Sequence, residues 1–391
     1  MDRFYLQNAD LYRSLIDSVD STVPAPHFSR HKAPPPNETV VKEQYNPDMV
    51  VAARIRPMLD EDVTVGFPRA VYPRARRTDE PQVVDLQDLY NHPRGRPVLR
   101  SSNYQLDMLF DSDATSTEIY ANLVLDLISF AQQGGVGTLF AYGQTGSGKT
   151  FTVSQLQKLA ALSLMDEDLL EQREIYITIV DIAANSAFDL LDSRKPIAVL
   201  EDSSGNTQLA GAKEHRVSAK DELLDLIAQA AVYRRTAPTM KNDASSRSHS
   251  ICRISIRNTS SSSGNDGILY LVDLAGSEAA RDVVQHGADR MRETREINMS
   301  LSVLKDCVQG KAESETFKLK GLRSKQKKVH VPIRQSTLTK VLKHVFDPTG
   351  GRACKTVVVA CVNPSLADVA QSKNTLRYAE MLRAPIPTAN R

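Results

Sequence analysis

Cysteine is scarce in this sequence, and no cysteine is spaced for a metal site. The four cysteines, Cys252, Cys307, Cys354 and Cys361, form no C-x-x-C pair and have no histidine at ligand spacing. Thiols scattered in this way are typical of free cysteines in a reducing compartment. The pattern therefore argues against disulfides and against a cysteine-bound metal.

Long apolar runs are also missing. No run of about 18 apolar residues exists, and the N-terminus has no apolar signal core. The 391 residues include 49 basic and 47 acidic side chains, so the net charge of +2 favours no class of partner. We therefore expect a soluble protein of the cytoplasm, without a membrane segment, built as two or three average domains or as one large α/β unit.

One glycine-rich stretch, Phe140-Ala-Tyr-Gly-Gln-Thr-Gly-Ser-Gly-Lys-Thr150, has the pattern of a phosphate-binding loop. The defining positions of G-x-x-x-x-G-K-[ST] are Gly143, Gly148, Lys149 and Thr150. The glycines let backbone N–H groups close around phosphates, and the next helix adds the positive end of its dipole. The lysine brings a positive charge to the β- and γ-phosphate oxygens, and the threonine hydroxyl is a ligand for Mg²⁺.

Strand-like and helix-like patterns alternate along most of the chain. We predict strands over residues 49–57, 104–111, 138–141, 174–182, 250–257 and 355–362, and another from residue 269 into a loop. We predict helices over residues 117–133, 152–161, 219–234, 293–308, 337–346 and 372–382, and short strands with long loops within residues 63–102. This alternation predicts an α/β fold with a central, mostly parallel β-sheet flanked by helices on both faces. The phosphate loop belongs at the carboxyl edge of such a sheet.

The first 48 residues differ in pattern from the rest of the chain. Apolar residues at roughly helical spacing within residues 5–19 predict a short amphipathic helix, and a proline-rich stretch comes after it. We expect residues 1–48 to be an N-terminal helix plus a neck or linker, residues 49–383 to form the globular domain, and residues 384–391 to be a tail. The helix either binds a partner or caps the domain.

Two further motifs fit a nucleotide site. Arg54-x-Arg56-Pro57 ends the first predicted strand, and guanidinium and pyrrolidine faces both stack on flat rings. Asp273 lies after a hydrophobic strand, where phosphate-loop NTPases place a second acidic residue that holds Mg²⁺ through water. Gly276, three residues on, can offer a backbone N–H to the γ-phosphate.

Together these motifs resemble the motor domain of kinesins. The residues that carry the resemblance are Arg54-x-Arg56-Pro57, the phosphate loop, Asn242-x-x-Ser-Ser-Arg-Ser-His249, Asp273-Leu-Ala-Gly-Ser-Glu278, Ile297-Asn-Met-Ser-Leu301 and Val331-Pro-Ile-Arg-x-Ser-x-Leu-Thr339. Their order and spacing match the family over about residues 49–383. The resemblance implies a phosphate-loop NTPase of kinesin type that hydrolyses ATP with Mg²⁺ and acts on microtubules of the cytoskeleton.

The resemblance also implies roles for individual residues. The nucleotide would be held by Arg54, Pro57, Gly143, Gln144, Thr145, Gly146, Ser147, Gly148, Lys149, Thr150 and Phe151. The metal would be held by Thr150 and Ser246, with Asp273 acting through water. The catalytic switch residues would be Ser245, Arg247, Gly276 and Glu278, and the pair Arg247–Glu278 would position the attacking water when the switches close.

The chain departs from the family pattern at two places. Phe151 stands where many kinesins have a histidine that packs on adenine, and its aromatic face can still stack. Asp181-Ile-Ala-Ala-Asn185 replaces the common Glu-Ile-Tyr-Asn-Glu, which removes a bulky aromatic ring and one acid. We expect the first change to preserve nucleotide binding and the second to alter local loop contacts.

Several stretches resemble the internal-motor class of kinesins, which depolymerises microtubules from their ends. These are Lys305-Asp-Cys307, Leu200-Glu-Asp202 and the stretch from Gly287 to Asn298. The Lys-Val-Asp finger of that class is missing before Asn103. Two prolines after Arg383 disfavour the docking strand of a walking motor, because each removes a backbone donor. A depolymerase, a walking motor and a microtubule-binding pseudo-motor with little turnover all stay open.

A basic stretch precedes Val331-Pro-Ile-Arg334, where kinesins present their filament-binding loop. The microtubule-binding residues implied are Arg281, Lys318, Lys320, Arg323, Lys325, Lys327, Lys328, Arg334 and Lys340, with Lys343 adding to this face. Such a surface would attract an acidic polymer at long range. The alternatives are a solvated charge run or a nucleic-acid site, and the near absence of stacking aromatic residues disfavours nucleic acid.

The sequence contains no guanine-selective motif, which disfavours a GTPase switch. It also contains no coiled-coil heptads, so we expect this segment to be monomeric, whereas a full-length protein may dimerise.

Overall fold

The computed structural model describes most of the chain. The described ranges are residues 3–20, 48–74, 82–93, 95–166, 173–203, 205–236, 244–259, 266–278, 288–319, 330–347 and 351–383. The predicted tail of residues 384–391 and the proline-rich stretch of the predicted linker lie outside these ranges, so the proposed domain division stays a prediction.

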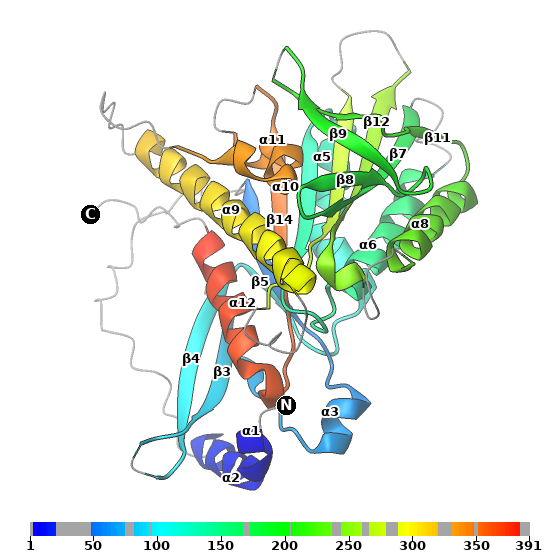
Figure 1. Ribbon diagram of the computed structural model, residues 1–391. Helices are drawn as coiled ribbons and strands as arrows, with labels where there is room; N and C mark the ends of the chain where they lie inside the picture. Colours follow the sequence, from blue (N-terminus) through cyan, green and yellow to red (C-terminus); the bar gives the residue numbers. More distant parts are fainter. Residues whose placement is uncertain are drawn as a thin grey trace, which may run out of the picture.

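A large mixed β-sheet forms the centre of the described chain (Figure 1). Its strands are β1 (Met49–Ile55), β5 (Met108–Phe110), β6 (Val136–Tyr142), β7 (Arg173–Ala183), β8 (Ser186–Asp189), β9 (Lys195–Glu201), β10 (Thr207–Ala210), β11 (His215–Val217), β12 (His249–Asn258), β13 (Gly267–Asp273) and β14 (Cys354–Val362). They are arranged in the order β10-β9-β8-β7-β12-β13-β6-β14-β1-β5, and β11 pairs with β7.

The parallel part of the sheet lies around β6. Strands β13, β6, β14, β1 and β5 all run parallel to their neighbours in this part, and Leu139 of β6 is in register with Leu271 on one side and Val357 on the other. The strands from β12 to β10 pair antiparallel. Because the five parallel strands end at the same edge, the loops after them meet there.

Helices cover both faces of the sheet (Figure 1). One face packs against α4 (Ser116–Leu123), α5 (Leu125–Gln132), α6 (Lys149–Leu164) and α8 (Lys220–Arg235), and the other against α9 (Ala288–Leu319), α10 (Thr337–Val341), α11 (Lys343–Phe346) and α12 (Val369–Leu382). Leu139 and Ala141 belong to the first core and Phe140 to the second, because successive residues of a strand point to opposite faces. The predicted α/β fold with helices on both faces is confirmed.

Residues 63–102 are more regular than the sequence predicted. The long strands β3 (Gln82–Tyr90) and β4 (Val98–Leu106) pair antiparallel and form a separate small sheet with β2 (Val71–Pro73). The prediction of short strands was wrong because Val84, Leu86 and Leu106 alternate toward a buried face. Short helical segments complete the fold: α3 (Asp60–Val65), η1 (Ala244–Arg247), η3 (Ile333–Gln335) and η4 (Leu366–Asp368).

Two predicted helices are each divided, and one is longer than expected. The helix predicted over residues 117–133 is divided at Val124 into α4 and α5, and the one predicted over 337–346 is divided at Leu342. The helix predicted over residues 293–308 runs on to Leu319. Among the described helices, none has the length and apolar character that a bilayer crossing requires.

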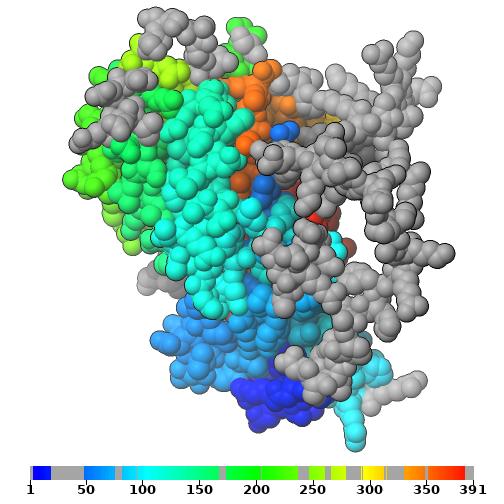
Figure 2. All heavy atoms as spheres, turned by 180° about the vertical axis from the view of Figure 1, so that it is seen from behind, coloured from blue at the N-terminus to red at the C-terminus, as the bar shows by residue number. Residues whose placement is uncertain are grey.

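The N-terminal helices α1 (Arg3–Gln7) and α2 (Ala9–Asp20) pack against the small sheet. Figure 2 shows them in dark blue at the lower end of the molecule. Tyr12 of α2 is only 1% exposed, and its hydroxyl lies 3.1 Å from the carbonyl oxygen of Arg69 and 3.3 Å from that of Gln87. Tyr5 donates to Asp88 on β3 at 3.1 Å. In this arrangement the N-terminal helix caps the domain.

We predict that Tyr12→Ala releases this cap. The substitution removes a buried ring and two polar contacts, so amide exchange across α2 should become at least about tenfold faster, with the core strands unchanged. Hydrogen exchange with mass spectrometry measures both regions in one experiment. Leu11→Ala is the matched control because Leu11 is 40% exposed. Equal exchange in the two variants would show that Tyr12 does not hold the helix.

Candidate functional site

The phosphate loop connects β6 to α6 at the carboxyl edge of the parallel strands. Gly143 has a φ of 150° and Gly148 a φ of 93°. A Cβ added to Gly143 would lie 2.3 Å from the carbonyl oxygen of Cys361, so no larger residue fits there. Gly143 is thus required by both backbone conformation and close packing, and Gly148 by its positive φ.

Lys149 is the buried cation of this loop. Its side chain is nearly covered, at 6% exposure, and its ammonium donates to the carbonyl oxygen of Gln144 at 2.7 Å. Burial lowers the pKa of Lys149 below its ordinary value. Within the described residues it forms no ion pair with a carboxylate, although Asp273 and Glu278 are near enough to act on its charge. A buried ammonium held by a carbonyl fits a site that takes an anion.

The residues expected to hold Mg²⁺ come together. Thr150 donates its hydroxyl to Asp273 Oδ2 at 2.7 Å, which joins the start of α6 to the end of β13. The other carboxylate oxygen of Asp273 is buried and has no hydrogen-bond partner within the described residues. Ser246 and Thr150 both line a cavity beside the phosphate loop. Oxygen atoms from a hydroxyl and a carboxylate are ligands that Mg²⁺ prefers, so these residues fit the metal.

The loop after β13 touches both the phosphate loop and η1. The N–H of Gly276 donates to the carbonyl oxygen of Ser246 at 2.9 Å, and Ser277 N–H donates to Gly143 O at 3.1 Å. Glu278 accepts from the backbone N–H of Thr145 at 2.9 Å and from its hydroxyl at 2.5 Å. The two predicted switches are therefore hydrogen-bonded to each other, and the second is also hydrogen-bonded to the phosphate loop.

The predicted pair Arg247–Glu278 stays a prediction for another state of the loops. In this structure each Glu278 carboxylate oxygen accepts a hydrogen bond from Thr145. Arg247 ends η1, and Ser245 lies within the backbone of that segment. Thr145 was predicted only as a nucleotide-binding residue, and its role as a partner of Glu278 was not foreseen.

A cavity of about 460 Å³ lies beside the phosphate loop. Its lining residues are Arg54, Arg56, Pro57, Leu59, Thr145, Gly146, Gly148, Lys149, Thr150, Phe151 and Ser246. Phe151 is 53% exposed, and the guanidinium carbon of Arg54 lies 5.3 Å from its ring centroid. These faces and the ring of Pro57 form a stacking surface for a planar group next to the phosphate loop.

Arg56 supports the loop, a role that the sequence pattern did not reveal. Its side chain is buried, and it donates to Gly146 O at 2.8 Å, to Pro57 O at 2.7 Å and to Asp62 at 3.0 Å. Since these three acceptors occupy its guanidinium, Arg56 orients the loop backbone, whereas Arg54 faces Phe151.

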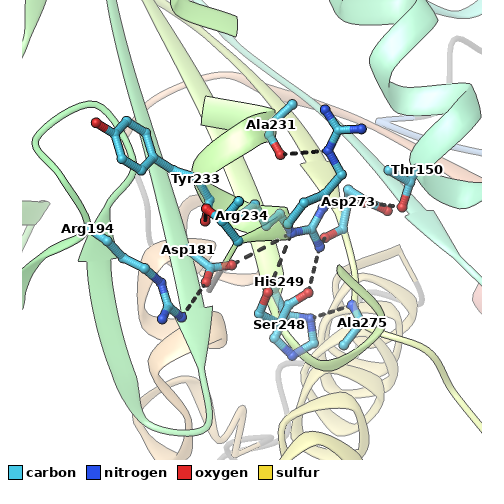
Figure 3. Close-up of polar contacts among 12 residues, drawn as sticks. Thr150, Asp181, Arg194, Ala231, Tyr233, Arg234, Ser248, His249, Asp273 and Ala275 are labelled. Carbon is cyan, nitrogen blue, oxygen red and sulfur yellow. Dashed lines mark hydrogen bonds and ion pairs between the residues drawn. The ribbon is translucent and has the colours of Figure 1, made fainter. Parts of the chain in front are cut away.

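Arg234 was also missed, and it positions Asp273. Figure 3 shows its guanidinium between two carboxylates, those of Asp273 and Asp181. It donates to Asp273 Oδ2 at 2.5 Å and to Ser248 O at 2.7 Å, and Asp181 Oδ1 lies 3.7 Å away. Arg194 donates to the other oxygen of Asp181 at 3.0 Å. Asp273 therefore lies at the end of an alternating chain of charges that begins with the partly buried Arg194 at the turn before β9.

The sequence held a signal for this role. The buried residues of α8 are Leu223, Ile227, Ala230 and Arg234, which lie at helical spacing. An arginine that continues an apolar stripe is turned toward the core, where a charge requires a partner.

His249 joins three parts of the site. Its Nδ1 accepts from the N–H of Ala275 at 3.0 Å, and its Nε2 lies 2.9 Å from the hydroxyl of Ser300 on α9 (Figure 3 draws the first contact). Ser300 donates its own hydrogen to Ile297 O at 2.7 Å, so Nε2 carries the proton and donates. Burial and the charges of Arg234 and Lys149 lower the pKa of His249 to about 3, so the ring is neutral.

This neutral ring predicts a loss of stability in mild acid. The folded pKa of His249 is lowered from 6.5 to about 3, and burial lowers that of His344 equally. A group whose pKa is lower in the folded state stabilises the fold fully above 6.5, and that contribution is lost as pH falls toward 3. The free energy of unfolding should decline by up to about 1.4 kcal/mol per pH unit for each histidine below 6.5.

Urea unfolding between pH 7.5 and 5.5 measures this slope. His249→Gln should reduce this slope by the contribution of one titrating histidine, up to about 1.4 kcal/mol per pH unit. The glutamine can accept from Ala275 but does not titrate. His330→Gln is the control, since His330 is exposed. A slope that is unchanged in His249→Gln would contradict the assignment.

The predicted microtubule-binding residues are only partly described. Arg334 on η3 has a side chain that is 76% exposed, and it forms two hydrogen bonds with Glu201 of β9. These contacts and Lys343 lower the pKa of Glu201 to about 2. Lys340 is half-buried, and Lys318 lies near the end of α9. The predicted residues Arg281, Lys320, Arg323, Lys325, Lys327 and Lys328 lie outside the described ranges.

Lys343 was expected on the exposed microtubule-binding face, but its side chain is turned inward. Its side chain is only 16% exposed, and its ammonium donates to Gly205 O at 2.8 Å. It lies 3.5 Å from Glu201 and 3.9 Å from Asp347. The sequence did not reveal this because α11 packs beside the β9–β10 hairpin, which brings these distant acceptors within reach.

Residues 54–384 match the kinesin motor domain family. The chain belongs to this family. Its kinesin motor domain is 36% identical over 296 residues to diatom spindle kinesin-1 of Cylindrotheca fusiformis. The aligned region covers 75% of this chain and 44% of that protein. It is 32% identical to kinesin-like protein KIN-13B of Arabidopsis thaliana (72% of this chain, 40% of that protein) and 33% identical to kinesin-like protein KIF24 of Homo sapiens (72% and 20%).

One solved structure is similar in fold. It is the C-terminal motor and motor homology domain of Kar3Vik1 fused to a synthetic heterodimeric coiled coil, with a TM-score of 0.70, 26% identity and 86% of each chain covered. The kinesin motor domain described here spans less than half the length of the sequence relatives named above.

Proposed function

We propose that this kinesin motor domain hydrolyses ATP with Mg²⁺ and that microtubules stimulate the turnover. The observation that carries the proposal is the meeting of three loops at one cavity: Thr150 bonds Asp273, Gly276 bonds Ser246, and Glu278 bonds Thr145. Phosphoryl transfer depends on the positioning of the reactants and on the neutralisation of phosphate charge. The residues at this edge of the sheet include hydrogen-bond donors and a cation that could serve these purposes.

The groups of the site have separable roles. Lys149 supplies positive charge to the phosphates, and Thr150 and Asp273 orient the oxygen ligands of the metal site. When bound, Mg²⁺ neutralises the charge that develops on the phosphate oxygens. Gly276 donates its N–H to Ser246 in this structure and would donate to the γ-phosphate in the closed state. Glu278 would leave Thr145 for Arg247, and that pair would position the attacking water.

His249 would transmit movement of the loop after β13 to α9, on the side of the domain that is proposed to bind the filament. Its ring connects Ala275 in the loop after β13 with Ser300 on α9. A loop ordered by the γ-phosphate relaxes after hydrolysis, and a rigid contact passes that movement to the packed element. In this proposal α9 moves with the loop, and the exposed residues around η3 and α9 bind the microtubule.

Turnover with and without microtubules tests the proposal directly. Steady-state phosphate release should rise with microtubule concentration and require Mg²⁺, and Glu278→Gln should lose stimulated turnover while it still binds nucleotide. Co-sedimentation with microtubules separates the alternative. Filament binding without any turnover above that of Glu278→Gln would identify a pseudo-motor instead.

Depolymerisation of microtubule ends is the second candidate. The resemblance of Lys305-Asp-Cys307 to the internal-motor class favours it, and on α9 the Asp306 side chain is exposed whereas Cys307 is buried. Light microscopy of stabilised microtubules with ATP distinguishes the two modes. Shortening from the ends would establish depolymerisation, and Asp306→Ala should then slow it. Gliding at constant filament length would establish a translocating motor.

A further inference from the structure

A second cavity lies at the opposite end of the parallel strands from the nucleotide site. Its volume is about 560 Å³. Val136, the first residue of β6, and Cys354, the first of β14, lie on its wall, so the length of a strand, roughly 20 Å, separates it from the phosphate loop. The turn between β9 and β10 and helix α11 form its other walls, and Figure 1 shows these elements close together. No role described so far uses this space.

The charged side chains that line the cavity are mainly basic. Arg253, Lys343 and Arg352 line it, and Asp347 is the acid among its lining residues. Arg253 Nε is buried and has no hydrogen-bond partner within the described residues, and Arg253 Nη1 forms a long ion pair with Glu214 at 3.8 Å. A buried guanidinium nitrogen without an acceptor requires a compensating group.

The other two cations differ in how well they are satisfied. Arg352 donates through Nε and Nη2 to a single acceptor, Gly134 O, at 3.3 and 3.2 Å. Lys343 donates to Gly205 O and forms ion pairs with Glu201 and Asp347. The two arginines, and not the lysine, are therefore the groups with donors left for a ligand.

The floor of the cavity is apolar and aromatic. Tyr270 stacks on His344 with ring centroids 4.5 Å apart and an interplanar angle of 19°, and Ile268 lies beside them. His344 is held through Nε2, which lies 2.9 Å from the Thr138 hydroxyl. Burial and the charges of Arg352 and Arg253 lower the pKa of His344 to about 3. The cavity thus combines a neutral ring floor with two arginines that have donors left over, the unpartnered Nε of Arg253 and the guanidinium of Arg352, which shares one carbonyl acceptor.

We propose that this cavity binds a small organic anion. A carboxylate or phosphate group would lie between Arg253 and Arg352, because planar guanidinium groups bind both in bidentate fashion. The apolar part of the ligand would pack on Tyr270 and Ile268. The volume is within the range of ligand sites, and this pairing of an apolar floor with few polar anchors is typical of them. The inference does not rest on motor activity.

Calorimetric titration with aryl anions tests the proposal. The protein is first saturated with Mg²⁺ and ADP so that added anions do not enter the nucleotide site. Phenyl phosphate and benzoate are the two probes, and neutral phenol is the reference. We expect at least one anion to bind in a one-to-one ratio and phenol to bind much more weakly. The stronger of the two probes identifies whether the site prefers phosphate or carboxylate.

Four variants, one of them a control, locate the binding site. Arg253→Gln and Arg352→Gln should each weaken the anion about tenfold or more, because each removes a charged donor. Lys355→Gln is the matched control, since Lys355 also lies near the start of β14 but pairs with Asp126 at 2.8 Å outside the cavity. Asp347→Asn removes the acid of the wall and should strengthen binding. This opposite shift keeps the test informative if an arginine variant does not fold.

The proposal would be overturned by three results. These are an anion affinity no higher than that of phenol, equal anion affinity in Arg253→Gln, Arg352→Gln and Lys355→Gln, and complete loss of anion binding when ADP concentration is raised further. The last would place the probe in the nucleotide site.

Discussion

Replacement of Lys149 by alanine should lower ATP turnover on the order of 10²- to 10³-fold. In the proposed mechanism Lys149 supplies the positive charge to the phosphates, and in this structure its ammonium donates to the Gln144 carbonyl oxygen. Alanine removes the charge where negative charge develops in the transition state. It also removes a buried cation that is costly without its ligand, so the apo protein should lose little stability.

Lys158→Ala is the matched control for this variant. Both lysines lie on α6, but Lys158 is exposed. Phosphate release and nucleotide affinity should be normal in Lys158→Ala and reduced in Lys149→Ala, with equal melting temperatures for the apo proteins. Turnover within about threefold of the parent protein in Lys149→Ala, against the 10²-fold loss expected when an electrostatic donor is removed, would exclude this loop as the site of hydrolysis.

Arg234→Met should destabilise the fold by about 3–5 kcal/mol, because removal of one member of a buried ion pair leaves its partners uncompensated. Methionine has a similar length and no charge. It would leave Asp273 without its strongest donor and would leave Asp181 with Arg194 alone. Since Asp273 also accepts from Thr150, the metal site should be disordered together with the core.

Graded variants separate the charge of Arg234 from its shape. Arg234→Lys keeps the charge but cannot reach Asp273 and Ser248 together, so its urea midpoint should lie between those of the parent and Arg234→Met. Arg194→Gln should cost less, since the Arg194 side chain is 19% exposed against 7% for Arg234. A metal titration of each folded variant then reports on Asp273. Equal unfolding midpoints for the parent and Arg234→Met would show that the buried network does not stabilise this domain.

The phosphate loop illustrates what could be predicted without a structure. Its glycines, Lys149 and Thr150 are adjacent in the chain, so their chemistry is written in local spacing. The strands and helices around it could be predicted from periodicity, and the α/β architecture was confirmed. Element boundaries were less predictable, as at Val124, where a continuous helical pattern is divided into two helices.

The partners of the site residues could not be predicted in the same way. Glu278 bonds Thr145 across a separation of 133 residues, and Arg334 bonds Glu201 across the same separation. Nothing in the local sequence around either residue names its partner. The nine-residue strands of the small sheet were also missed, because the prolines and arginines of residues 63–102 outweighed the apolar alternation in β3.

The sequence alone was enough to predict the fold class, the phosphate loop and the resemblance to kinesins, because each depends on residue types at short, fixed separations along the chain. Which charges face one another was settled by the packing of distant elements. That packing brought Arg234, Asp181 and Asp273 together beneath the proposed metal site, turned Lys343 inward, and left Arg253 at the wall of a second cavity. The physical reason is that a buried charge is stabilised by whatever the fold places beside it, and strand order, not chain order, sets those neighbours.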